Sequence, residues 1–133
     1  MTQTIRGEFD VKLPALSVDG LPADSRFARR KIEKQFHGEL AAQSQGEMLS
    51  HSTATPGSAG YVALEQVQGS LQGRRGSFVL LHIGRMNRGS ASLEVTVVPD
   101  SGTDELTGLS GRMNIEIAGG KHFYVFEYSL ANT

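Results

Sequence analysis

The residues best suited to chemistry are a carboxylate and an imidazole, Glu65 and His82, in segments whose alternation predicts two adjacent strands. The arms 60–71 and 76–86 flank Gly73–Arg74. A two-residue loop that begins with glycine suits a type II′ hairpin turn. That register places Glu65 directly opposite His82. Such a pair can move a proton on a small substrate, and it can also contact a ligand or simply fix the register of the sheet.

Burial decides which protonation state this pair adopts. Its face of the hairpin also carries Tyr61, Val67 and Phe78, so we expect it to face the protein interior. Desolvation favours the neutral forms, whereas mutual attraction favours the ion pair. Lys34 falls on the apolar face of its own segment, where it either reaches water or meets a carboxylate such as Glu65. The predicted ligand-binding residues are Glu65, His82, Tyr61, Lys34, Tyr124 and Tyr128.

The remaining histidines and serines do not form a recognisable site. His37, His51, His82 and His122 lack the spacing of metal ligands, and no carboxylate cluster accompanies them. Ser50 precedes His51, but the GxSxG pattern of a nucleophile elbow is absent. We therefore expect neither a metal nor a cofactor.

A basic cluster at 26–34 is the one feature that suggests phosphate binding. We interpret it as a solvated strand edge, because charged side chains discourage edge-to-edge pairing. The whole chain has 13 basic and 14 acidic residues and a formal charge of −1, which gives no field for steering nucleic acid. Its few aromatic residues are expected to point inward rather than to stack on bases. No nucleic-acid partner is expected.

The elements that position these residues are predicted to be strands. Ile5–Leu13 alternates apolar and polar residues, residues 14–24 form a loop, and 103–106 forms one helical turn. The last hairpin turns at Gly119–Gly120, which pairs Ile117 with His122. A four-residue loop at 87–90 puts Leu93, Val95 and Val97 on the face of His82.

Together the segments make eight strands in meander order within a single domain, 1–133. We predict an all-β fold, a closed eight-stranded antiparallel barrel, because closure removes both sheet edges. Inward-facing glycines suit the bends of such a barrel. A β-sandwich is the alternative. The chain has no Cys, no apolar run near the length of a membrane span and no secretory signal, so we expect a cytoplasmic protein without a membrane partner.

Several short motifs resemble an uncharacterised bacterial domain family of unknown function. They are GEML (46–49), GYVALE (60–65), GSFVLLHIG (76–84), SLEVTVVPDSGTDELTGLSG (92–111) and FEYSL (126–130). The resemblance implies a closed barrel similar in architecture to plant allene oxide cyclase, and it implies no activity, because fold does not carry function. The cyclases are oligomeric, which makes a homo-oligomer an expectation to test.

The favoured function is binding of a small apolar or amphipathic ligand inside the barrel. One alternative is a small isomerase or cyclase that uses Glu65 and His82 as an acid–base pair. The other is an oligomeric scaffold with a filled interior. Leu81 and Ile83 make the second face of their strand apolar as well. If that face lies outward, a contact with another subunit is its expected cover.

Overall fold

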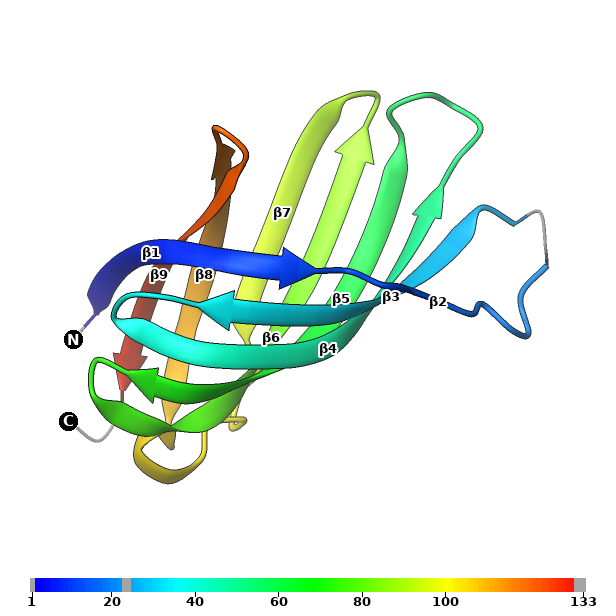
Figure 1. Cartoon of the computed structure of the whole chain (residues 1–133). Helices are drawn as coiled ribbons and strands as arrows, with labels where there is room; N and C mark the ends of the chain where they lie inside the picture. Colours follow the sequence, from blue (N-terminus) through cyan, green and yellow to red (C-terminus); the bar gives the residue numbers. More distant parts are fainter. Residues whose placement is uncertain (1, 23–24, 131–133) are drawn as a thin grey trace.

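The structure is a computed structural model that describes residues 2–22 and 25–130. Within these ranges it contains nine β-strands, one 3₁₀ turn and no α-helix. Figure 1 shows β1 crossing in front of the long strands that form the opposite wall. The elements are β1 (Gln3–Lys12), β2 (Ala15–Leu16), β3 (Phe27–Phe36), β4 (Leu40–Ser52), β5 (Ala59–Leu71), β6 (Arg74–Asn87), β7 (Ser90–Val97), η1 (Asp104–Leu106), β8 (Leu109–Ala118) and β9 (Lys121–Leu130).

The strands form one closed antiparallel meander. The sheet order is β1-β9-β8-β7-β6-β5-β4-β3-β2, and an additional pairing of β1 with β3 closes it. Because β2 adds only two residues to the edge of β3, the barrel proper has eight strands, β1 and β3–β9. The predicted closed eight-stranded barrel is therefore confirmed, and the sandwich alternative is wrong.

The segment 14–24 differs from its prediction as a plain loop, because it contains β2. Besides the β2–β3 pairing, two contacts hold this segment against β3: Lys31 donates its backbone N–H to the Pro14 carbonyl at 2.9 Å, and the Arg29 guanidinium donates to the Ser17 carbonyl at 3.2 Å. Residues 23–24 of the same segment lie outside the described residues.

The turn between β5 and β6 corrects the prediction of Gly73–Arg74. Gln72 and Gly73 form it, with φ of 47° and 83°, and positive φ at both central residues is the signature of a type I′ turn. Gln72 holds a left-handed φ that is uncommon for a residue other than glycine. Its backbone N–H donates to the Glu39 carbonyl at 2.8 Å, a contact between distant segments that favours a turn at Gln72–Gly73.

In the observed register, Glu65 and His82 belong to successive inward-facing pairs of the hairpin and are diagonal neighbours. Glu65 lies opposite Leu80, and His82 lies opposite Ala63, so the predicted direct pairing of Glu65 with His82 is wrong. The shift is two residues, an even number, and side chains alternate with a period of two. Both residues consequently stay on the predicted inward face.

The other local predictions agree with the structure. The β8–β9 turn pairs Ile117 with His122 as expected, and the turn after β6 pairs Val95 with His82 and places Leu93 and Val97 on the same face. The predicted helical turn is η1.

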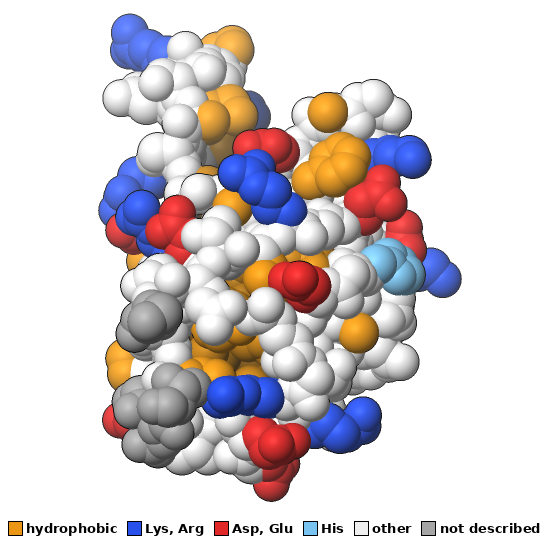
Figure 2. Space-filling model, turned by 90° about the vertical axis from the view of Figure 1, so that its left-hand side faces the viewer, with side chains coloured by type: hydrophobic (Ala, Val, Ile, Leu, Met, Phe, Trp, Pro, Cys, Tyr) orange, Lys and Arg blue, Asp and Glu red, His pale blue; other side chains and the backbone are white. Residues whose placement is uncertain are grey.

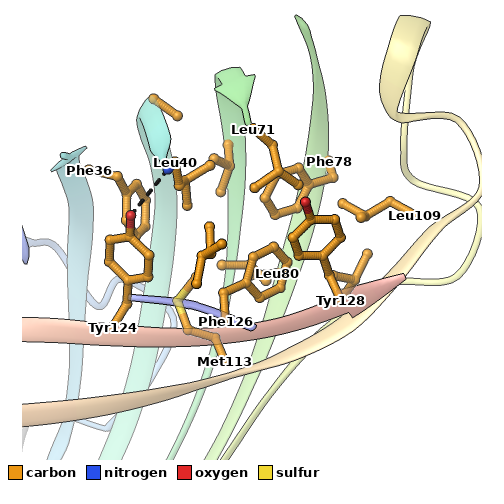
Figure 3. Close-up of a cluster of buried hydrophobic side chains, with 14 of the residues drawn as sticks. Phe36, Leu40, Leu71, Phe78, Leu80, Leu109, Met113, Tyr124, Phe126 and Tyr128 are labelled. Carbon is orange, nitrogen blue, oxygen red and sulfur yellow. Dashed lines mark hydrogen bonds between the residues drawn. The ribbon is translucent and has the colours of Figure 1, made fainter. Parts of the chain in front are cut away.

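One end of the barrel is filled by large side chains. Figure 3 shows Tyr124, Phe126 and Tyr128 of β9 pointing toward the facing strands. The Tyr124 hydroxyl donates to the His37 carbonyl at 2.7 Å and accepts the Leu40 N–H at 3.2 Å, so it ties β9 to the β3–β4 turn. The side chains that fill this closed half are Phe36, Leu40, Leu71, Phe78, Leu80, Leu106, Leu109, Met113, Tyr124, Phe126 and Tyr128.

The opposite end is less completely filled. Figure 2 shows that the upper edge of the molecule is notched, with hydrophobic side chains beside the notch. Met86, Leu93 and Ile117 near this end are 43%, 44% and 69% exposed although they belong to the inward-facing rows. The barrel thus has a packed half and an open half.

We expect Tyr124→Phe to lower the free energy of unfolding by about 1–3 kcal/mol, because the buried Leu40 N–H loses its acceptor and the His37 carbonyl its donor. Urea denaturation measures the change. Ser110→Ala, at an exposed position, serves as the control and should have an effect within about 0.5 kcal/mol. Equal stability of Tyr124→Phe and the wild type would show that this hydroxyl does not hold the closed end.

Candidate functional site

Four neighbouring strands each contribute one inward side chain to a polar cluster in the barrel. Lys34 lies on β3, Ser44 on β4, Glu65 on β5 and His82 on β6. Lys34 pairs directly with Ser44, whereas Glu65 and His82 are diagonal neighbours across their hairpin. Gly46, the β4 residue opposite Glu65, is needed because a Cβ there would lie 1.9 Å from the Leu64 carbonyl oxygen. The cluster therefore depends on close approach of β4 and β5.

The Glu65 carboxylate is the centre of this cluster. Its Oε2 lies 2.8 Å from Lys34 Nζ and 2.5 Å from His82 Nε2. Its Oε1 accepts a hydrogen bond from Ser44 Oγ at 2.6 Å. Glu65 is 1% exposed and His82 4% exposed, so these contacts take place out of water. Each carboxylate oxygen has a protein partner, as a buried charge requires.

The charge state of Glu65 follows from these contacts. Burial alone raises the pKa of the carboxyl, but the hydrogen bond with His82 and the positive charge of Lys34 outweigh burial and lower the pKa to about 2. The attraction between the groups therefore wins over desolvation. The Lys34 ammonium also lies 4.9 Å from the centroid of the Phe9 ring and 5.7 Å from that of Phe36, close enough for cation–π attraction.

Tyr61 lies beside this cluster, with its ring centroid 6.4 Å from that of His82. Burial, together with the negative charge of Glu65, raises the pKa of its phenol. Tyr61 therefore keeps its proton at neutral pH and is a hydrogen-bond donor. Within residues 2–22 and 25–130, no hydrogen bond to its hydroxyl is formed. Its ring occupies the space above Gly84, where a Cβ would lie 2.2 Å from Tyr61 Cε1.

An apolar pocket of about 290 Å³ adjoins Tyr61 in the open half of the barrel. It lies between β5, β6 and β7, with Ser50 of β4 at its border, and the side chains that line it include Ala59, Met86, Ala91 and Leu93. A larger hollow of about 540 Å³ lies elsewhere, among outward-facing glutamines such as Gln66 and Gln68. We assign the site to the smaller pocket, because a largely apolar cavity with a few polar side chains at its border, here Tyr61, Ser50, Arg85 and Ser92, is the usual form of a small-molecule site.

The structure brings together three of the six predicted site residues, Glu65, His82 and Lys34, and places Tyr61 next to them. It places Tyr124 and Tyr128 in the closed half, where their hydroxyls bind His37 and Gln72. Ser44 is the member that sequence reasoning missed. Ser44 could be identified only by its position opposite Lys34, and that position follows from the register of β3 against β4.

The basic cluster of β3 divides between the two faces of its strand. Arg29 forms a salt bridge with Glu47 at 2.7 Å, and Lys31 forms one with Glu33 at 3.1 Å, with all four side chains well exposed. Lys34 alone is enclosed by the barrel.

In the described ranges, no group of three His, Cys, Asp or Glu residues could hold a metal ion. No helix in that part of the chain is long and apolar enough to cross a membrane.

Glu65→Gln tests the charge assignment. We expect it to destabilise the fold by about 3–5 kcal/mol at neutral pH, because Lys34 loses its buried counter-charge. Since the Glu65 pKa is lower in the folded state than its ordinary value of 4.5, its contribution is present above that value and is lost as pH falls toward about 2. Urea denaturation between about pH 2 and 5 should therefore show a weaker pH dependence in the variant.

The control for this experiment is Glu116→Gln, which changes an exposed carboxylate and should leave the pH dependence almost unchanged. A ¹³C NMR titration of the Glu65 carboxyl in the wild-type protein gives an independent reading. A Glu65 pKa at or above its ordinary value would contradict the ion-pair assignment.

Comparison with known proteins places the chain among relatives without an assigned activity. The sequence profile of the family described as "Protein of unknown function (DUF3224)" matches residues 5–128. The chain is similar to a protein with unknown function from the DUF3224 family of Shewanella oneidensis MR-1, known from a crystal structure. That structure is 48% identical, the match covers 100% of both chains, and the TM-score is 0.94. No curated protein matches the chain.

Proposed function

The chain belongs to the DUF3224 family of proteins of unknown function, as the resemblance of its motifs implied. For this member of the family, we propose that the open half of the barrel binds a small apolar or amphipathic molecule. The proposal rests on the protonated hydroxyl of Tyr61, which has no hydrogen-bond partner among the described residues and lies beside an apolar pocket of about 290 Å³.

The pocket supports a ligand that is mostly apolar. Ala59, Met86, Ala91 and Leu93 offer contact surface but no hydrogen-bonding side chain. Tyr61 supplies a donor and, because its pKa is raised, does not supply an anion at neutral pH. A ligand with one acceptor oxygen on an apolar body satisfies both features.

The polar cluster of Lys34, Ser44, Glu65 and His82 adjoins the proposed site but does not bind the ligand itself. Glu65 already has Lys34, His82 and Ser44 as partners, so it has little capacity left for a ligand. Its carboxylate instead contacts the His82 ring beside Tyr61. The raised pKa of Tyr61 is caused mainly by burial and secondarily by the charge of Glu65. Tyr124 and Tyr128 are engaged in the closed half, and the proposed site does not include them.

The alternative of acid–base catalysis by Glu65 and His82 has less support. A carboxyl with a pKa of about 2 is fully ionised at neutral pH, so Glu65 has no proton to give and is a weak base. His82 Nε2 is occupied by the same carboxylate. In this arrangement Glu65 would orient His82 rather than exchange protons with a substrate.

Ligand binding is tested with a medium-chain ketone and the alkane of the same length. We expect the ketone to raise the melting temperature more than the alkane does, because a ligand that binds only the native state stabilises it. Tyr61→Phe should remove the advantage of the ketone, worth about 0.5–1.5 kcal/mol for one hydrogen bond. Calorimetric thermal scans with and without each ligand measure both effects.

Two tryptophan variants on β7 locate the site in the same assay. Ala91→Trp adds a large side chain at the pocket and should abolish stabilisation by both ligands, whereas Glu94→Trp on the outward face should leave it intact. Stabilisation that persists in Ala91→Trp, or that vanishes equally in both variants, would place binding outside this pocket.

A second role, that of an oligomeric scaffold, is favoured by an apolar patch on the outer wall. Leu49, Val62 and Leu64 are 38%, 50% and 53% exposed on adjacent strands, and Leu81 borders the same groove. The packed half of the barrel fits a scaffold as well. We propose that this patch is covered by a second copy, because exposed apolar patches of this kind mark protein contacts.

Sedimentation velocity over a range of concentrations tests this self-association. We expect the wild-type protein to be oligomeric and Leu64→Glu to be monomeric, because the introduced charge would be buried in the contact. Gln66→Glu, the next outward residue on β5, adds the same charge outside the groove and should keep the wild-type state. A monomeric wild-type protein would remove the scaffold role.

A further inference from the structure

Strands β7 and β8 are neighbours joined by a single registered pair, Thr96 with Arg112. Every other junction between adjacent barrel strands has at least four such pairs. Beside the bridged end, the 98–108 loop covers the barrel, where Thr103 donates its N–H to the Ser77 carbonyl at 2.9 Å. Toward the open end, Ser90–Glu94 and Asn114–Ala118 are not paired with each other. We call the gap between these two runs the β7–β8 seam.

The seam presents two strand edges that the rest of the described chain does not pair. β7 is paired only with β6 along Ser90–Glu94, and β8 only with β9 along Asn114–Ala118. In a strand, alternate N–H and C=O groups point to each side, so each run directs unpaired backbone groups into the seam. Figure 1 shows β7 and the β8–β9 hairpin rising as separate arms at this end. The group that complements such an edge is another extended backbone.

The side chains of the seam alternate in chemistry. Extending the register from Thr96–Arg112 would place Leu93 opposite Ile115 on the inward face. Leu93 and Ile117 are 44% and 69% exposed there, so this side of the seam is apolar. On the outward face, Glu94 and Glu116 are exposed, and neither forms a salt bridge with a described residue. An added strand would thus meet apolar contacts on one face and negative charge on the other.

We propose that the β7–β8 seam binds an extended peptide segment in which apolar residues alternate with Lys or Arg. Its backbone would pair with an exposed edge, its apolar side chains would cover Leu93 and Ile117, and its basic side chains would face Glu94 and Glu116. A second copy of this chain is the poorer occupant, because its own seam edges would bring like charges together. This inference does not rest on the small-molecule site.

Hydrogen exchange with a defined probe tests the proposal. The probe is a capped nine-residue peptide that alternates Lys and Val, and the matched control is the same peptide with every backbone amide N-methylated, which removes the donors of both edges. We expect the unmodified peptide to slow amide exchange in Ser90–Glu94 or Asn114–Ala118, and the N-methylated peptide to have no such effect. Equal binding of both peptides, or no slowing in either run, would overturn the proposal.

Charge variants separate pairing at the seam from general attraction of a basic peptide. Glu94→Lys combined with Glu116→Lys should weaken binding by about tenfold, because two exposed attractive charge pairs are lost. Asp19→Lys, at an exposed position away from the seam, should change affinity less than about twofold. Equal weakening by both sets would show non-specific attraction and overturn the proposal. A variant that carries both Glu94→Ser and Glu116→Ser gives a further check. If this variant self-associates while the wild type binds no peptide, the two acids only prevent edge-to-edge pairing, and the proposal is overturned.

Discussion

The buried charge of Glu65 is the constraint on which the rest of this barrel depends. A carboxylate that is 1% exposed is tolerated only if it is paired and hydrogen-bonded, and removal of one partner of such a pair typically costs about 3–5 kcal/mol. Its three partners come from three other strands, β3, β4 and β6. Four consecutive barrel strands are therefore held in one register by one side chain. A slip of any of them by one residue would turn a partner away and leave the charge unpaired.

The same constraint separates the two halves of the barrel. On one side of the cluster, aromatic and aliphatic side chains fill the interior, and tyrosine hydroxyls fasten β9 to two turns. On the other side, Tyr61 lies over Gly84, the pocket begins, and Met86 and Leu93 are partly open to solvent. The charged cluster forms the boundary between the two halves, and Tyr61, whose pKa is raised mainly by burial, lies at the edge of the open half. Stability and candidate function are thus located in different halves of one domain.

The open half also has the weakest strand junction. β7 and β8 share one registered pair, and the loop that follows β7 closes only the bridged end of that junction. Closure through the pairing of β1 with β3 and β9 leaves the barrel complete, yet with two strand edges available near the pocket. The outer wall adds an apolar patch on β4, β5 and β6. The molecule thus offers an inner pocket and a seam, which share Leu93, and a separate patch on the outer wall.

The sequence by itself determined the strands, their faces and the barrel. Alternation with a period of two is a local property, so Phe78, Leu80 and His82 could be assigned to one face without any knowledge of their neighbours. Family membership followed from motifs, and the double-glycine turn at 119–120 defined the register of the last hairpin. The same alternation placed Lys34 on an apolar face and left two outcomes open, contact with water or with a carboxylate such as Glu65; the structure shows the second.

The tertiary structure alone decided which residues touch. The β5–β6 turn lies at Gln72–Gly73, where Gln72 bonds the Glu39 carbonyl through its N–H and contacts the Tyr128 hydroxyl, contacts that no local pattern specifies. Ser44 entered the cluster because pairing of β3 with β4 aligned it with Lys34. Tyr124 and Tyr128 share the inward face of the site residues but lie toward the other end of the barrel. Alternation specifies the face of a strand, whereas position along the barrel axis depends on how every strand is staggered against the next.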